Sequence, residues 1–220
     1  MSTKNYLSTE YFPVSEIPDD HWSIKLDPKY GIGTVNVLGN HNLWVKINPT
    51  DHRGYRIIVQ YIGKDIKDIK STLNRKWTIE ETEALFKVGA VMNQFYYNLD
   101  LTPQIYFAGN NSMELVNSKI IIGRKEPAML HIHILGRGNP NEYHIQNSSL
   151  KLDCPEVGEE FNLKGQGDEK NNMKKLPWTE DQRIRFKSLL THFMNEMVEQ
   201  NQFISFNAQE EVDHQFTKEI

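Results

Sequence analysis

The segment EPAMLHIHILGRGNP, residues 126–140, decides how this chain folds and where its chemistry lies. Alternate residues of a β-strand share a face. A strand over residues 128–135 therefore places His131 and His133 on one side, together with Met129 and Leu135. The other side is uniformly apolar and should pack on the core; it consists of Leu130, Ile132 and Ile134. We expect two imidazoles roughly 7 Å apart along one face of this strand, with the functional site centred on them.

The residue types on that face predict chemistry at phosphorus. Imidazole is a good nucleophile near neutral pH, because its unperturbed pKa leaves much of it uncharged. A phosphoryl or nucleotidyl group can pass to one histidine and then to water or another acceptor, while the second histidine hydrogen-bonds the phosphate or the leaving group. Gly136 and Gly138 predict a turn that presents Arg137 and backbone N–H groups to an anion. A His-x-His pair is also typical of a metal site, with His144 or His52 as a third ligand.

The surrounding sequence predicts an α+β domain. Three strands with short, turn-prone links indicate an antiparallel meander, and a helix with a Thr78–Glu81 capping box follows. The expected strands cover residues 34–38, 43–48, 54–61, 104–108, 115–122 and 128–135. A second helix opens with Thr179 and Gln182, and the tail after Gln200 is ambiguous. The polar stretch 136–177 is predicted to be a lid or partly disordered.

Composition limits the class of protein. The chain has 220 residues, 38% of them hydrophobic, which suits one domain with a sizeable core. Its formal net charge of -4 argues against a nucleic-acid partner, and no apolar run approaches the roughly 20 residues of a membrane span. The single cysteine, Cys154, favours a reducing compartment. We expect a cytoplasmic protein that needs no cofactor, and the leading interpretation assigns no metal ligands.

Residues 130–136, LHIHILG, resemble the motif H-φ-H-φ-H-φ-φ of the histidine triad (HIT) superfamily, where φ is apolar. The order of elements is similar too: a strand with a proline turn at its end, an apolar strand, a lysine-bearing linker and an amphipathic helix all precede the histidine strand. The resemblance covers about residues 33–137, between an N-terminal arm (1–32) and a polar loop with a C-terminal helix packed on the same domain (138–220). It implies a HIT-like α+β fold, often a homodimer. It also implies nucleotide or nucleotide-conjugate ligands, handled by hydrolases or nucleotidyl transferases.

The resemblance also assigns roles to single residues. His131 corresponds to the middle histidine, which attacks the α-phosphate, and His133 to the third, which contacts phosphate. Met129 stands where the first histidine would be, and Lys46 lies near the position of the acid that holds the ribose hydroxyls. Some branches of the superfamily lack the first or the third histidine and still act on phosphate esters. His52 is close enough in sequence to replace a histidine that often precedes the second strand.

Three functions stay open from the sequence. The first is a HIT-like phosphohydrolase or nucleotidyl transferase with a His131 intermediate, and the second is a metal-dependent hydrolase that uses the His-x-His pair. The third is a non-catalytic nucleotide-binding protein, which Met129 and Lys46 motivate. The candidate catalytic residues are His131 and His133. The candidate ligand-binding residues are Arg137, Asn110, Asn111, His52 and Lys46.

Overall fold

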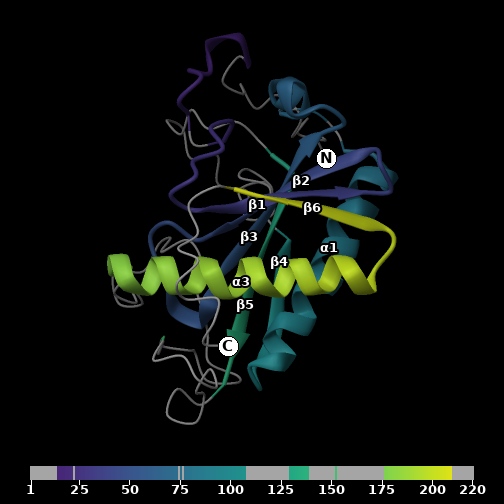
Figure 1. Ribbon diagram of the computed structural model, residues 1–220. Coiled ribbons are helices and arrows are strands. Elements are labelled where there is room, and N and C mark those ends of the chain that lie inside the picture. Colours follow the sequence, from purple (N-terminus) through teal and green to yellow (C-terminus); the bar gives the residue numbers. More distant parts are fainter. Residues whose placement is uncertain are drawn as a thin grey trace, which may run out of the picture.

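The structure is a computed structural model that describes residues 14–21, 23–73, 75, 77–107, 129–138, 152 and 176–209. One sheet and two long helices dominate it (Figure 1). The strands are β1 (Gly31–Val37), β2 (His41–Ile47), β3 (Ile57–Gly63), β4 (Thr102–Phe107), β5 (His131–Arg137) and β6 (Ile204–Ala208). The helices are α1 (Ile79–Asn98) and α3 (Glu180–Gln200), with short 3₁₀-helices at Val14–Glu16, Arg53–Tyr55 and Ile66–Thr72.

The described strands form one antiparallel sheet in the order β4-β5-β3-β2-β1-β6. The meander β1-β2-β3 confirms the prediction from the short links, and the sheet with its helices confirms the α+β class. The histidine strand β5 is inserted between β3 and β4, so it has a neighbour on each side. A strand in that position is held by two hydrogen-bonded ladders, which fixes the direction of its side chains.

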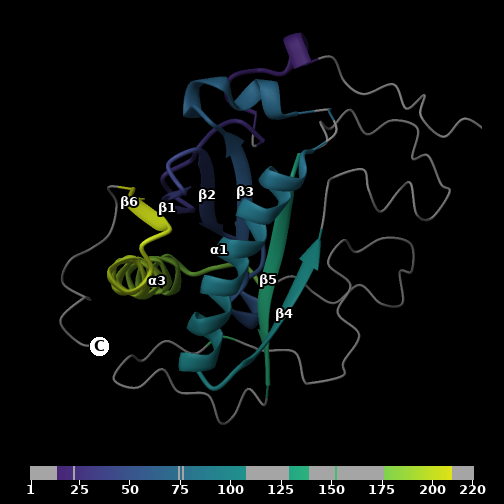
Figure 2. The same ribbon diagram turned by 90° about the vertical axis from the view of Figure 1, so that its right-hand side faces the viewer.

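The two faces of the sheet carry different clusters. The face that includes Val45, Val59, Ile132 and Ile134 packs with α1 and α3 into the main apolar core. Figure 2 shows α1 lengthwise over the strands and α3 nearly end-on beside β1 and β6. The opposite face holds a smaller cluster, in which Ile17 and Ile24 of the N-terminal segment pack on Trp44, Ile62 and Met129. The histidines of β5 lie on this second face.

Both helices begin as the sequence predicts. The Thr78 side chain accepts from the backbone N–H of Glu81, and the Glu81 side chain accepts in turn from the backbone of Thr78. Thr179 and Gln182 make the same reciprocal pair at the start of α3. These capping boxes satisfy backbone N–H groups that have no partner inside the helix. In the core, the Phe95 ring of α1 lies 5.8 Å from Phe186 and 5.3 Å from Phe193 of α3.

Local details differ from the sequence prediction in three places. The third strand starts at Ile57 rather than at residue 54, because Gly54 (φ 67°) and Tyr55 (φ 52°) adopt left-handed conformations that a strand cannot contain. The expected turn after residue 135 is wrong: Gly136 and Arg137 continue β5 and pair with Pro103 and Thr102 of β4. The ambiguous tail after Gln200 supplies β6, which pairs with β1.

Gly136 is required by the packing of β5 against helix α1. A Cβ at this position would lie 2.6 Å from the Leu101 side chain and 2.9 Å from the Tyr96 ring.

The predicted strand 115–122 and most of the stretch 136–177 lie outside the described residues. None of the helices in the described part of the chain combines the length and the apolarity needed to cross a bilayer.

Candidate functional site

The register of three adjacent strands brings the candidate residues onto one face. His131 of β5 lies opposite Gln60 of β3, which lies opposite Trp44 of β2. One step along, His133 lies opposite Ile58, which lies opposite Lys46. Residues directly opposite each other in an antiparallel pair project from the same face. The histidines and Lys46 are therefore neighbours across the sheet, although 85 or more positions separate them in the sequence.

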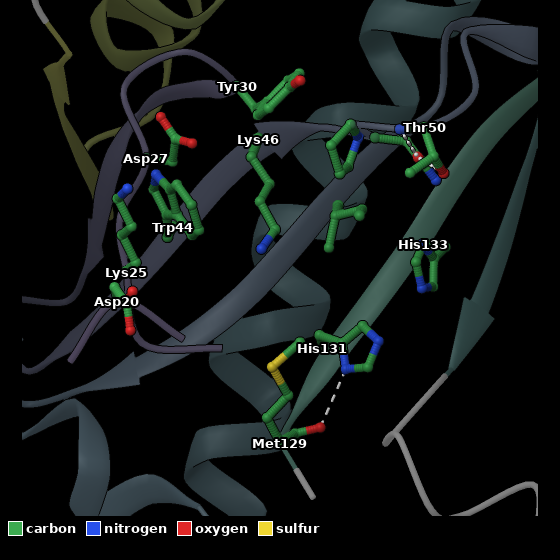
Figure 3. A pocket seen from close by; sticks show the side chains of 13 residues that line it. Asp20, Lys25, Asp27, Tyr30, Trp44, Lys46, Thr50, Met129, His131 and His133 are labelled. Carbon is green, nitrogen blue, oxygen red and sulfur yellow. Dashed lines mark hydrogen bonds between the residues drawn. The ribbon is translucent and has the colours of Figure 1, made fainter. Parts of the chain in front are cut away.

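A cavity of about 540 Å³ opens on this face, with its residues shown in Figure 3. A volume of this size lies within the range typical of small-molecule sites. The sheet forms its floor, and the segment that precedes β1 forms one wall. Its lining consists of Asp20, Lys25, Asp27, Tyr30, Trp44, Lys46, Asn48, Pro49, Thr50, Ile58, Met129, His131 and His133.

His131 is held in one orientation by the backbone. Its Nδ1 lies 3.1 Å from the carbonyl oxygen of Met129. A carbonyl can only accept, so Nδ1 carries the proton and Nε2 of the neutral ring keeps its lone pair. The residue is only 3% exposed and lines the cavity, so a ligand reaches its ring from the cavity. The arrangement leaves His131 with an unprotonated nitrogen for attack or for hydrogen bonding.

His133 has the opposite arrangement of protons. Its Nδ1 lies 3.2 Å from a guanidinium nitrogen of Arg56, a residue that is 6% exposed. Because a guanidinium only donates, Nδ1 of His133 accepts, and the neutral ring carries its proton on Nε2. His133 therefore presents an N–H donor where His131 presents a lone pair.

The two imidazoles are close enough to act on one group. Their ring centroids are 5.0 Å apart and the rings are inclined at 76°. This is shorter than the roughly 7 Å spacing expected along the strand, because the rings incline toward each other. A lone pair on His131 beside a donor on His133 is the arrangement that nucleophilic attack on a phosphate needs, with stabilisation of its oxygens or of the leaving group.

Lys46 lies in the same cavity and is 6% exposed. Its Nζ lies 3.3 Å from Oε1 of Gln60 and 4.2 Å from the centroid of the Trp44 ring. Burial lowers the pKa of Lys46 to about 7, and the carboxylate of Asp27 opposes this shift only in part. The amine therefore changes its charge near neutral pH, which an exposed lysine does not do.

The other sequence-predicted residues lie apart from this cavity or outside the described residues. Arg137 is buried and donates from Nε to the side chain of Gln104 on β4. His52 does not line the cavity; its ring packs edge-on against Trp178, with centroids 5.6 Å apart. Asn110 and Asn111 lie outside the described residues. Whether these four bind ligand stays a prediction.

Sequence reasoning missed Arg56, Gln60 and the wall residue Asp27. Gln60 shares the alternation of β3 with Ile58, and Arg56 lies just before that strand, so a paired register of β3 and β5 is the signal that would have found them. Asp27 lies in a segment without periodicity, and the sequence carries no sign of its position. Gln60 is fully buried and donates to the backbone carbonyl of Ser23 at 2.7 Å, which ties the sheet to the cavity wall.

Within the described ranges, no group of three or more His, Cys, Asp or Glu side chains is placed to hold a metal ion. The proposed third ligand His144 lies outside those ranges, and His52 lies against Trp178. The metal-dependent reading therefore stays an untested prediction.

Comparisons with known proteins agree with this fold. A family model described as HIT-like, HIT-related matches residues 31–189, which is more than half of the chain. The crystal structure of uncharacterized protein LPG0439 is similar with a TM-score of 0.76 and 28% sequence identity. The alignment covers 89% of this chain and 96% of that one. The search among curated proteins gave no match.

Proposed function

This chain belongs to the HIT-related family of HIT-like proteins, and on that premise we propose that it is a nucleotide phosphohydrolase or nucleotidyl transferase with a covalent intermediate on His131. HIT family proteins generally bind nucleotides, and the family supports a nucleotide-related hydrolase or transferase in general terms. The observation that carries the more specific proposal is the pair of hydrogen bonds that leave His131 with a lone pair and His133 with an N–H beside it.

The reaction begins with attack on phosphorus. Nε2 of His131 forms a bond to the phosphorus atom as the bond to the leaving group breaks. The leaving group departs with the electron pair of that bond, and its negative charge is stabilised by a hydrogen bond from Nε2–H of His133, whose Nδ1 stays hydrogen-bonded to Arg56. The His131 ring becomes positively charged, and its Nδ1–H then donates a stronger, charge-assisted hydrogen bond to the Met129 carbonyl.

A second displacement completes the cycle. Water or another acceptor attacks the phosphorus from the side of His133, where the leaving group departed, and the proton of the acceptor passes to solvent. The bond between phosphorus and Nε2 of His131 breaks, and the ring returns to its neutral form. Water as acceptor makes the protein a hydrolase, and a phosphate or nucleotide as acceptor makes it a transferase.

The test is a turnover panel of nucleoside phosphoramidates, dinucleoside polyphosphates and sugar nucleotides. We expect His131→Gln to lower kcat by about 10³-fold or more, and His133→Gln by less, since the nucleophile is kept. His192→Gln is the matched control, because His192 lies on α3 and pairs with Glu196 rather than with the cavity. Denaturing mass spectrometry of a rapidly quenched reaction should show the covalent adduct in the wild type and in the variants that keep His131, and not in His131→Gln. Full turnover by His131→Gln on every accepted substrate would refute the proposal.

A nucleotide-binding protein without turnover is the second candidate. The specific observation in its favour is Met129, which is 1% exposed and brings a thioether rather than an imidazole to the cavity. Such a protein shows a rise in melting temperature with nucleotide and no product over hours at high enzyme concentration. The homodimer and the cytoplasmic location stay predictions from the sequence.

A further inference from the structure

Lys46 is the feature of the cavity that the proposed reaction does not use. It lies on β2, two strands away from the histidines, and its side chain extends into the space that His131 and His133 face (Figure 3). The contacts of its ammonium group include the Gln60 amide oxygen and the face of Trp44. A lysine in such surroundings has lost most of its hydration, and a neutral contact restores only part of it.

The charges in the cavity wall do not offset this loss. The carboxylate of Asp27 acts on Lys46, yet the pKa of Lys46 still falls to about 7 because burial is the larger effect. The exposed Lys25, from the same wall, adds positive charge to the cavity. The remaining titratable residues of the lining are Asp20, Tyr30, His131 and His133. A neutral ligand that fills the cavity would remove further water from Lys46 and favour its uncharged form.

A ligand with a negative charge near Lys46 has the opposite effect. It stabilises the ammonium form and makes a charge-assisted hydrogen bond in surroundings of low polarity, where such bonds are strong. From this geometry we propose that the cavity binds nucleotides that carry two phosphate groups, one at His131 and a second, on the sugar, at Lys46. The proposal rests on the proposed function, because it takes the first phosphate to lie at His131.

The spacing of the sheet suits two phosphates on one sugar. Lys46 lies across from His133, and His131 lies two residues further along β5. Two strand spacings of about 4.8 Å and two residues of about 3.4 Å separate the backbones of Lys46 and His131 by about 12 Å. The Lys46 side chain shortens this span, because Nζ lies at the side chain of Gln60 on the intervening strand β3. Gln60 is in turn the cross-strand partner of His131.

The experiment measures affinity by isothermal titration calorimetry, with ligands that differ only in the second phosphate. They are adenosine 5′-monophosphate, adenosine 3′,5′-bisphosphate and adenosine 2′,5′-bisphosphate. We expect the wild type to bind at least one bisphosphate roughly tenfold or more tightly than the monophosphate, and Lys46→Met to bind both kinds within about twofold of each other. Lys25→Met, which also removes one lysine from the cavity, should keep most of the preference because its charge is exposed and screened.

The outcomes separate this inference from the proposed function. Equal affinity for all three ligands in the wild type, or a preference that survives in Lys46→Met, overturns the inference. An equal loss in Lys25→Met also overturns it, since that result would indicate general attraction rather than contact with Lys46. A Lys46-dependent preference without any turnover upholds the inference and contradicts the proposed catalysis. Turnover of nucleotide conjugates without the preference for bisphosphates upholds the proposed catalysis and contradicts the inference.

Discussion

Replacing Lys46 by methionine should stabilise the protein at neutral pH. The pKa of this lysine falls from 10.5 to about 7 on folding, chiefly because burial disfavours the charged form. Each unit of such a shift corresponds to about 1.4 kcal/mol. The charged form is therefore less stable in the folded protein by about 4–5 kcal/mol, and about 4 kcal/mol of that cost remains at pH 7.

The Lys46→Met substitution removes the energetic cost of the buried charge, but it also removes a contact of the lysine. Methionine fills a similar volume with no charge, but Gln60 Oε1, which lies 3.3 Å from Nζ, loses a donor. A buried acceptor that loses its partner costs about 1–3 kcal/mol. The net expectation at pH 7 is a gain of about 1–3 kcal/mol in the free energy of unfolding, from about 4 kcal/mol gained less this loss.

The sign of the pH dependence follows from the direction of the shift. Between pH 7 and 10.5 the unfolded chain binds a proton at Lys46 that the folded chain has largely lost, so the wild type gains stability as pH rises. The difference in free energy of unfolding between Lys46→Met and the wild type should therefore shrink as pH rises. Between pH 8 and 10 it should fall by about 1.4 kcal/mol per pH unit. Below pH 7 the difference should level off at its largest value.

The assay is urea denaturation of both proteins at half-unit steps from pH 6 to 9.5, so that all other titrations cancel in the difference. Lys25→Met serves as the control for the loss of one positive charge from the same cavity. Parallel stability profiles for the wild type and Lys46→Met across this range would refute the reasoning. That result would mean that Lys46 keeps its charge, and with it much of its hydration, in the folded protein.

Two further substitutions test how the site is held in place. Tyr96→Phe should lower the free energy of unfolding by about 1–2 kcal/mol, because the Tyr96 hydroxyl donates to the buried Tyr55 carbonyl at 2.8 Å; no change in the urea midpoint would contradict this. Gly54→Ala should lower the melting temperature clearly more than Gly39→Ala. Both glycines have positive φ, but only the Cβ at position 54 would meet a backbone atom, the Gly136 oxygen at 2.7 Å. Equal losses in melting temperature for these two alanine variants would contradict the steric argument.

The sequence predicts well those features that short-range patterns encode. The alternation of residues 131–135 places the histidines and the apolar residues on opposite faces, as the burial of Ile132 and Ile134 confirms. The capping boxes at Thr78 and Thr179 mark the starts of both helices correctly. In each case the deciding residues lie within a few positions of one another, so the local chemistry is visible without a fold.

Features that depend on pairing between distant segments could not be predicted in the same way. The segment Ile204–Ala208 becomes a strand because β1 offers it an edge, and its own sequence alternates only weakly. Arg56 meets His133 through the register of β3 and β5, which no pattern within either segment specifies. The cavity wall around Asp27 is held by contacts from α3, where Lys187 donates to the Pro28 carbonyl and Arg183 to the Lys29 carbonyl.

The first position of the histidine motif matters here for its backbone rather than for its side chain. Met129 gives His131 a carbonyl acceptor, and any residue at that position would give the same group, because every residue has a backbone carbonyl. The lone pair on Nε2 of His131 follows from that hydrogen bond, so the loss of the first imidazole leaves the nucleophile oriented. What the methionine changes is the cavity wall, where a polar ring gives way to an apolar side chain that packs with Trp44. The departure from the motif therefore affects which ligand fits. Lys46 lies beside the same tryptophan, so substitution of Lys46 should change that ligand preference.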